Sequence, residues 1–307
     1  NINDEELVGQ SINKALLRSR SKVKLAAVAV SGASVITKTI QMSSDLNDDD
    51  LEQQIQLEAD KYIPYPLEEV AMDFEVVGEV EGNKELSDVL LAACRKETVE
   101  LREDALEIGG LQSEIVDIEA FAVERSYENM ALNMDLDFNN DNSENEIVAI
   151  FDIGSTSTTL NVLQNGSIIY TRDQGFGGTQ LTEDIQRRYG MSEQEAEKAK
   201  LEGGLPDDYQ TEVLEPFKEG LVQQVSRSLQ FFYSSSQFND VDCILLSGGV
   251  AAMTGIEEIV HEKIGVPTKV VNPFKGMAVG SKVNQNLLKQ DAPALMVACG
   301  LALRSFE

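Results

Sequence analysis

Three turns in the C-terminal half of the sequence combine glycines or hydroxyl side chains with the end of an apolar strand. The first is Asp152-Ile-Gly154-Ser155-Thr156, which closes the apolar run 147–153. Placing a carboxylate at the end of a buried strand costs free energy unless the carboxylate contacts a cation or hydrogen-bond donors. Gly154 lets a ligand approach the backbone, and the hydroxyls and turn N–H groups that follow can form a nest for phosphate oxygens. A plain hairpin with Ser and Thr on its solvated edge is the alternative interpretation.

The second and third turns are richer in glycine. Gly177 and Gly178 precede a helical pattern, where they can admit a phosphate to exposed N–H groups. A flexible joint is the alternative there, and the two interpretations are compatible. Gly248 and Gly249 follow another buried strand and permit a flat base or a sugar to lie against the backbone, unless they form only a tight turn into a helix. A strand rather than a helix follows the first turn, and the sequence contains neither GxxxxGK[ST] nor GxGxxG, which excludes a P-loop and a Rossmann site.

The elements around these turns must bring them together. Apolar strands and a hairpin across Asn165-Gly166, a dipeptide typical of type I′ turns, are predicted at 147–153, 160–163, 167–171 and 241–246. Residues 179–240 read as mostly helical, with a long amphipathic stretch over 213–233. A final apolar helix is expected over 294–303. Residues 135–146 are polar and acidic, which predicts a linker before the strand that carries Asp152.

The N-terminal half predicts a compact module at 23–94. An apolar strand over 23–30 is expected to form a hairpin with 35–42, and Asn47 caps a helix whose first turn is acidic. Pro64 and Pro66 end that helix, and two further strands follow at 72–76 and 88–94. Helices flank the module at 3–20 and 96–109, and a strand and a helix follow at 114–118 and 120–130.

Composition narrows the function classes. The chain has 307 residues, with 25 Lys and Arg against 53 Asp and Glu, and a net charge of −28. That charge argues against binding of a nucleic-acid backbone and against docking of a basic patch on anionic lipid. The 3 cysteines form no CxxC pair, so a disulfide framework or a structural zinc site is not expected. No run approaches the ~20 apolar residues of a membrane span.

Taken in this order, the three turns resemble the ATP site of the actin and sugar-kinase superfamily, with Asp152-Ile-Gly154 as a phosphate loop and Leu246-Ser-Gly248-Gly249 as the adenosine loop. Ala298-Cys-Gly300-Leu-Ala302 is similar to the second connecting helix of that superfamily, and the 23–94 module to the extra subdomain of its FtsA-like branch. Longer stretches such as EADKYIPYPLEEVAMDFEVVG, FGGTQLTEDI, LQFFYSSS and NPFKGM resemble the PilM family, the cytoplasmic actin-like proteins of type IV pilus assembly. The resemblance extends over essentially the whole chain.

The resemblance implies a role for individual residues. ATP or ADP would be the cofactor, with Mg²⁺ held by Asp152 through water. The phosphates would be cradled by Gly154, Ser155 and Thr156, with Gly177 and Gly178 near the terminal phosphate. Ala196-Glu197-Lys198-Ala199-Lys200 is similar to a helix whose Glu and Lys reach ribose and adenine, although a solvated charge pair explains Glu197 and Lys200 equally well. The adenosine would be bound by Gly248, Gly249 and Met253. Glu119 would orient an attacking water, unless it is simply an exposed acid at a helix start.

The resemblance also implies an α/β, actin-like two-lobed fold with an FtsA-like inserted subdomain. Its expected parts are lobe 1A at 1–22, 95–145 and 288–307, subdomain 1C at 23–94, lobe 2A at 146–178 and 241–287, and subdomain 2B at 179–240. The first strand of the family, its phosphate-1 loop and two more strands are not found before Asn1. We therefore expect half of the phosphate site to be missing from this chain.

The expected function is that of an ATP-binding scaffold with slow or absent hydrolysis, in pilus (fimbrium) biogenesis and twitching motility. The resemblance places the N-terminal peptide of PilN in a groove between the first lobe and the 23–94 module. It implies the PilN/PilO complex and the motor components as further partners, and a cytoplasmic location at the inner membrane, reached through proteins and without membrane insertion. We expect Tyr62 or Tyr65 to face that groove, because Pro64 and Pro66 stiffen this aromatic edge. The alternative is that the tyrosines cap the core of the module itself.

Two other functions are weighed against this one. A filament-forming division protein of the FtsA type would end in an amphipathic membrane helix, whereas this sequence stops at LALRSFE. A small-molecule kinase would need a general-base Asp near a sugar pocket, and the sequence offers no aromatic or Asn/Asp cluster suited to a sugar.

Overall fold

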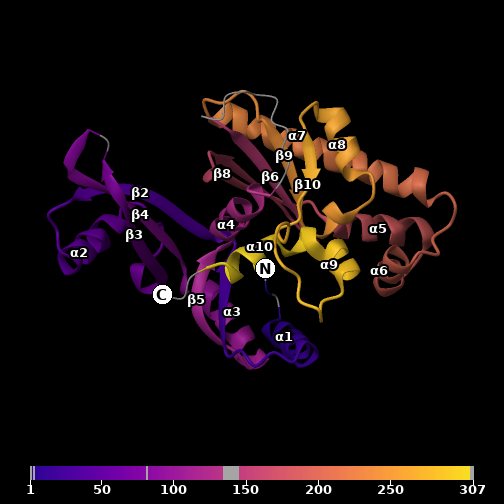
Figure 1. Ribbon diagram of the computed structural model, residues 1–307, viewed down its shortest axis with the longest axis horizontal. Coiled ribbons are helices and arrows are strands. Elements are labelled where there is room, and N and C mark those ends of the chain that lie inside the picture. Colours follow the sequence, from indigo (N-terminus) through magenta and orange to yellow (C-terminus); the bar gives the residue numbers. More distant parts are fainter. Residues whose placement is uncertain (1, 3, 81, 134–144, 305–307) are drawn as a thin grey trace. The chain divides into compact units, whose positions relative to one another are not determined.

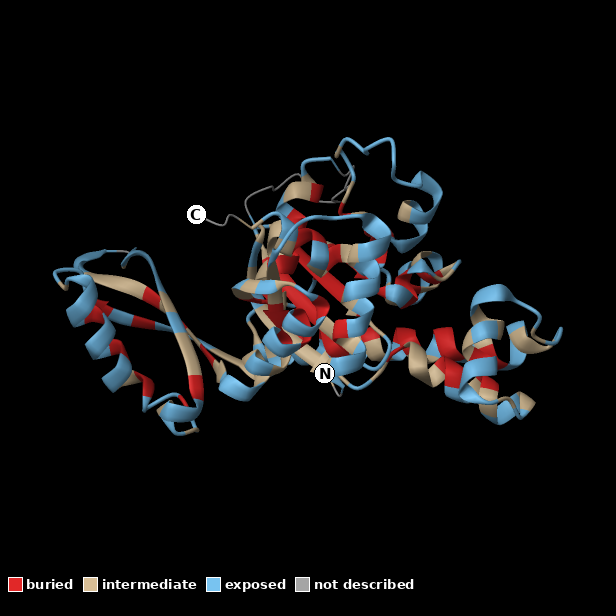
Figure 2. Cartoon of the chain, turned by 90° about the horizontal axis from the view of Figure 1, so that it is seen from below, coloured by how far each residue is buried: buried red, intermediate tan, exposed pale blue. Residues whose placement is uncertain are grey.

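The structure is a computed structural model that describes residues 2, 4–80, 82–133 and 145–304 (Figure 1). The chain divides into two compact units, Asn1–Glu119 with Phe306–Glu307, and Ala120–Ser305. Most of the predicted linker, residues 135–144, lies outside the described residues. In each unit the buried residues, red in Figure 2, lie on both helices and strands.

Two parallel strands, β1 (Leu25–Val30) and β5 (Gln112–Ile118), pair in the N-terminal unit. Helix α3 (Lys96–Gly109) packs beside these strands, and α1 (Glu5–Ser19) packs on α3 so closely that a Cβ on Gly9 would lie 2.5 Å from the side chain of Ile108. The expected hairpin between 23–30 and 35–42 is therefore wrong. The run that forms β1 is continuously apolar, which is typical of parallel strands, whereas a strand with one face in water alternates.

The second sheet of this unit has the order β2-β4-β3 and is antiparallel. Its strands are β2 (Val35–Ser43), β3 (Val70–Val80) and β4 (Asn83–Arg95), and α2 (Asp48–Ala59) packs on one face. Asn47 caps α2 as predicted, because its Oδ1 accepts a hydrogen bond of 3.0 Å from Asp50 N. The sheet and helix correspond to most of the 23–94 module, but β1 belongs to the other sheet. The boundaries of the four expected subdomains stay predictions.

The C-terminal unit is built on a five-stranded sheet of order β10-β9-β6-β7-β8. Its strands are β6 (Ile147–Ile153), β7 (Thr158–Gln164), β8 (Ser167–Gln174), β9 (Cys243–Ser247) and β10 (Thr268–Val270). β6, β9 and β10 are parallel, while β7 and β8 form the predicted hairpin. The Asn165-Gly166 turn has φ values of 52° and 86°, as a type I′ turn requires.

Helices cover both faces of this sheet. One face packs on α5 (Gly178–Tyr189), α6 (Glu193–Glu202), α7 (Glu215–Ser235) and α8 (Ile256–Ile264), and the other on α4 (Glu119–Ala131) and α10 (Met296–Ala302). The side chains of β6 alternate between these two cores, with Phe151 on the first and Ile150 on the second. A short helix, α9 (Gln285–Asp291), precedes α10. This alternation buries β6 on both sides and fixes the end of the strand where Asp152 lies.

A close helix contact holds α10 against α4. A Cβ on Gly300 would lie 1.7 Å from Ala122 O, so a glycine is required at this crossing. Among the helices of the described ranges, none is long and apolar enough to cross a membrane.

Candidate functional site

The first predicted turn is held at the centre of the five-stranded sheet. Asp152 lies on β6 opposite Ser247 of the parallel strand β9 and opposite Thr159 of β7. Beyond β6, Gly154 N donates to Ser157 O over 2.9 Å, which closes the turn. The chain leaves this turn as β7, as the sequence predicted. Residues 155 and 156 are exposed at its tip.

The second turn packs directly on the first. Gly178 N donates to Gly154 O over 3.0 Å, and Thr179 N donates to Ser155 O over 2.7 Å. Gly177 N donates to Gln180 Oε1 over 2.6 Å. These three N–H groups are therefore already bonded within the protein, which differs from the expectation of open donors at this helix start. A Cβ on Gly177 would lie 2.5 Å from Ser155 O, so the glycine is needed for the close approach of the two turns.

The third turn covers the end of β6 from the other side. Gly248 has φ of +88°, a conformation that side chains rarely adopt, and its N–H donates to Pro293 O over 2.8 Å. Gly249 opens a short 3-10 helix, Gly249–Ala252. In the described part of the protein no atom lies within 4 Å of a Cβ built on Gly249. The two adjacent glycines thus have different roles, since Gly248 allows close packing and Gly249 borders open space.

The three turns and the helical segment after α5 surround a cavity of about 730 Å³. Seven of the eleven residues predicted to bind the cofactor line it, namely Gly154, Ser155, Gly178, Glu197, Lys200, Gly249 and Met253. The other four, Asp152, Thr156, Gly177 and Gly248, belong to the same turns without lining the cavity. Its volume lies within the range of small-molecule sites, which is roughly 300–1,000 Å³. The structure therefore brings together turns that lie about one hundred residues apart in the sequence.

One wall of the cavity carries a charged cluster. Lys200 Nζ lies 2.7 Å from Glu197 Oε1 and donates to Thr182 Oγ1 over 2.8 Å. Thr182 in turn donates to Glu197. Lys200, and to a lesser extent Thr182, holds the pKa of Glu197 below its usual value by hydrogen bonding to the carboxylate. The pair is therefore tied to a buried threonine of α5, which a simple solvated pair on one helix would not be.

Asp152 is half-buried, and its carboxyl lies against Gly248 of the third turn. Burial raises its pKa to about 6, and a hydrogen bond with Ser247 opposes that rise. Ser247 is itself fully buried. Among the described residues, no group of three or more His, Cys, Asp or Glu side chains could hold a metal ion.

Part of the cavity wall consists of residues that the sequence motifs did not indicate. Tyr209, Gln210 and Leu214 line it, and they come from or adjoin a π-helical turn, Gln210–Leu214, that precedes α7. Lys218 of α7 also lines it, although its side chain is only 8% exposed, and its Nζ donates to Thr254 O over 2.5 Å. The sequence does contain a pattern that points to Lys218 as a functional residue. Lys218 occupies a position of the apolar stripe of α7, four residues before Val222, where an unpaired cation is not expected.

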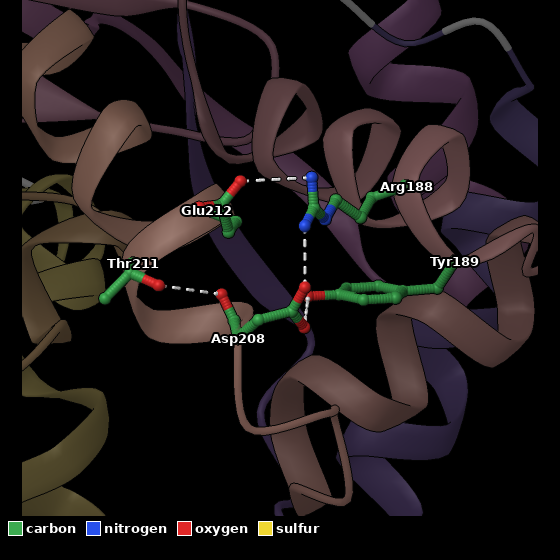
Figure 3. Close-up of polar contacts among 5 residues, drawn as sticks. All are labelled: Arg188, Tyr189, Asp208, Thr211 and Glu212. Atoms are coloured by element: carbon green, nitrogen blue, oxygen red, sulfur yellow. Dashed lines mark hydrogen bonds and ion pairs between the residues drawn. The ribbon is translucent and has the colours of Figure 1, made fainter.

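A polar network fixes the segment that carries Tyr209 (Figure 3). Arg188, near the end of α5, lies 2.6 Å from Asp208 Oδ2 and 3.1 Å from Glu212 Oε2. Tyr189 OH donates to Asp208 Oδ1 over 3.0 Å, and Thr211 Oγ1 donates to Asp208 O over 3.3 Å. Arg188 and then Tyr189 lower the pKa of the Asp208 carboxyl through their hydrogen bonds. The network ties the end of α5 to the π-helical turn and so positions two residues of the cavity wall.

Three other predicted residues lie in the N-terminal unit. Glu119 is the last residue of that unit's continuous segment and the first of α4, and its catalytic role stays a prediction. Tyr65 packs on the core between α2 and the sheet, with Arg95 Cζ 4.4 Å from its ring centroid. Tyr62 is 39% exposed, and Lys38 Nζ lies 5.8 Å from its ring centroid. Tyr65 thus fits the alternative that a tyrosine caps the core of the module.

A separate cavity of about 200 Å³ exists within the N-terminal unit. It lies between the C-terminal ends of β1 and β5, the start of α3, and the face of β3 and β4 that α2 does not cover. Its lining residues are mostly small and apolar: Val30, Val35, Ala71, Met72, Asp73, Ala92, Ala93, Cys94, Val99, Val116, Asp117 and Ile118. Neither Tyr62 nor Tyr65 is part of this described lining.

Proteins of known structure resemble this chain over nearly its whole length. A solved structure of a PilM–PilN type IV pilus biogenesis complex contains a chain that is 28% identical, with a TM-score of 0.77, over 99% of this chain and 86% of that chain. The cell division protein FtsA of Bacillus subtilis (strain 168) is 27% identical over 152 residues, which are 41% of this chain. The match spans about a third (34%) of the length of that curated relative. MreB5 of Spiroplasma citri, solved with ADP, has a TM-score of 0.49 at 14% identity over 98% of this chain and 75% of that chain.

The likeness to the chain of the PilM–PilN complex agrees with the α/β, actin-like class that the resemblance implied. The model of one family, described as type IV pilus assembly protein PilM, matches residues 1–306. With this match over nearly every residue, and with the cavity formed by its three turns, the chain belongs to the PilM family of type IV pilus assembly proteins.

Proposed function

We propose that this protein is a nucleotide-binding scaffold of the type IV pilus machine, which links an inner-membrane complex to cytoplasmic motor components. The single observation that supports nucleotide binding is the cavity of about 730 Å³ that the three turns share. ATP or ADP would occupy it, with phosphates at Gly154 and Ser155 and the base beside Gly249 and Met253. Hydrolysis would be slow or absent, because a scaffold can use a bound nucleotide simply to stabilise its folded state.

Several contacts support this assignment of the cavity. Glu197 and Lys200 present one acceptor and one donor group on its wall, where a ribose or a base needs polar partners. Lys218 adds a second cation that is largely withdrawn from water. Asp152 fits Mg²⁺, since a carboxyl whose pKa is raised by burial gains from a cation, and Mg²⁺ often takes one carboxylate together with water and phosphate oxygens. When bound, the ion would neutralise phosphate charge beside the first turn.

The experiment compares two glycines that have equal room for a side chain. Among the described atoms, both Gly249 and Gly175 have open space where a Cβ would stand, but only Gly249 lines the cavity. In Gly249→Leu the new side chain should fill the cavity and weaken Mg-ATP binding by at least tenfold in calorimetric titrations. Gly175→Leu should bind like the parent. If Gly249→Leu is folded and binds Mg-ATP with unchanged affinity, the nucleotide does not occupy this cavity.

We further propose that the partner is PilN and that the N-terminal unit receives its N-terminal cytoplasmic peptide. The support is the likeness, over 99% of this chain, to a PilM chain solved in a complex with PilN. The cavity of about 200 Å³ offers small apolar side chains beside the exposed carboxylate of Asp73, a combination that suits a peptide with apolar and basic side chains. Proteins at the membrane, including a PilN/PilO complex, would then hold this protein at its inner surface.

Two arginine substitutions on the same sheet face test the docking proposal. Ala92 lines the cavity, whereas Thr39 lies farther along the sheet and does not. Ala92→Arg should weaken binding of a synthetic PilN N-terminal peptide at least tenfold, and Thr39→Arg should leave it unchanged. Nucleotide affinity serves as the check that both variants are folded. If the two variants and the parent bind the peptide with equal affinity, the peptide does not dock in this cavity.

A further inference from the structure

The charges of this acidic protein are strongly segregated near its N-terminus. Residues 7–44 contain none of the 53 Asp and Glu residues, yet they contain six cations: Lys14, Arg18, Arg20, Lys22, Lys24 and Lys38. Five of these six fall within residues 14–24. The net charge of −28 is an average over the whole chain and does not reveal such a segment.

The structure exposes these five cations together. They occupy the C-terminal half of α1 and the segment that leads into β1, and all five are exposed to solvent. α1 buries the side formed by Gly9 and Ile12 against Ile108 and Gly109 of α3. Leu7, Lys14 and Arg18 follow one another at spacings of seven and four residues. This spacing places all three on one side of the helix, opposite Gly9 and Ile12. We call the exposed side chains of Lys14, Arg18, Arg20, Lys22 and Lys24 the basic patch.

Among the described residues, the cations of the basic patch form few polar contacts within the protein. None of its members takes part in the ion pairs recorded among the described residues, and Lys24 Nζ reaches only Gly110 O, at 3.5 Å. The negative end of the helix dipole favours Arg18 in the last turn of α1, but this effect fades within that turn and does not explain Lys22 or Lys24. Leu17, 71% exposed, lies among the cations.

We propose that the basic patch docks directly on an anionic membrane surface. Long flexible cations around an exposed leucine suit lipid headgroups, which require charge and no defined shape. The acidic remainder of the protein does not prevent this contact, because charges farther than about 8 Å from the surface are screened at physiological salt. This contact would orient the protein at the membrane that its partner complex occupies, and it does not depend on the nucleotide site.

The test is flotation of the intact 307-residue protein with lipid vesicles at about 0.1 M salt. The parent should float with vesicles that contain one third phosphatidylglycerol and should not float with pure phosphatidylcholine. Binding to the anionic vesicles should be lost at about 0.5 M salt. In Lys14→Glu/Arg18→Glu/Lys22→Glu the partition coefficient should fall more than tenfold, since each such cation contributes about fivefold.

A matched variant separates the basic patch from net charge. Lys275→Glu/Lys282→Glu/Lys289→Glu changes the total charge equally, also at exposed positions, and should keep the vesicle binding of the parent. Equal losses in both triple variants, or parent binding that does not distinguish anionic from neutral vesicles, would overturn the proposal. So would the absence of any binding by the parent. The salt and lipid dependence of the parent decides the matter even if the first variant fails to fold.

Discussion

The backbone of Gly248 lies directly against the side chain of Asp152. A Cβ on Gly248 would stand 2.6 Å from Asp152 Oδ1 and 2.3 Å from Ile153 O. The third turn therefore covers the carboxyl at the end of β6 and contributes to the burial that raises its pKa to about 6. Gly248, which follows β9, and the Asp152 carboxyl at the end of β6 therefore pack as one structural unit.

Gly248→Ala should lower the free energy of unfolding by roughly 2–4 kcal/mol. The cost combines a backbone conformation that is nearly restricted to glycine with a methyl group placed on the end of β6. Gly249→Ala is the matched control, since its Cβ would enter open space and its effect should be below about 1 kcal/mol. Urea unfolding followed by circular dichroism measures both. Similar midpoints for the two variants would contradict the packing described for Gly248.

Asp152→Asn should stabilise the protein without nucleotide at pH 8, by an amount on the order of 2–3 kcal/mol. The native carboxyl has a pKa of about 6, above its ordinary value of about 3.9, so the folded protein binds this proton more tightly than the unfolded chain does. The parent therefore loses stability as the pH rises through 6, and the neutral amide does not.

Urea unfolding of the parent and of Asp152→Asn across pH 4–8 gives the stability gap between them. The gap should be largest above pH 7 and should close as the pH falls towards 4. A gap that is constant with pH would show that the carboxyl is not buried in the way described. Mg²⁺ with ATP should reverse the order at pH 8 if Asp152 serves the ion as proposed.

Arg188→Gln should loosen the segment that carries Tyr209 and Gln210. Arg188 bridges Asp208 and Glu212 across the turn, and without it we expect backbone amides of 207–214 to exchange hydrogen at least about threefold faster. Arg187→Gln is the control, because Arg187 pairs with Asp184 inside α5 alone. Mass spectrometry of peptides after deuterium labelling reads out both variants. Unchanged exchange in 207–214 would mean that the network does not hold this segment.

Tyr65→Ala should destabilise the N-terminal unit by about 2–4 kcal/mol, because Tyr65 packs on the α2 core and Arg95 lies over its ring. Tyr62→Ala should cost less than about 1 kcal/mol, since that ring is largely at the surface. Thermal unfolding distinguishes the two. Neither folded variant should lose affinity for the PilN peptide if the cavity beside Ala92 receives it, and a tenfold loss in Tyr62→Ala would instead restore the aromatic edge as the contact.

Much of the local structure was determined by the sequence alone. Asn47 caps α2, Asn165-Gly166 turns the β7–β8 hairpin, and the run 147–153 forms a strand, because capping, turn geometry and apolar runs depend on neighbouring residues. The order of the three turns also predicted a shared site, and seven of the residues named for it line one cavity. Short-range interactions of this kind depend on a few consecutive residues and can therefore be predicted from the sequence.

The tertiary structure decided which distant segments meet. β1 pairs with β5 across more than eighty residues rather than with its neighbour β2, since strand pairing depends on what covers each face. Lys218 and Tyr209 reach the cavity only because α7 and its π-helical turn pack beside the three turns. Likewise, the acid-free segment 7–44 becomes a patch only when α1 buries one side on α3 and turns its cations outward. Burial and pairing over such distances are properties of the packed chain, so local patterns leave them open.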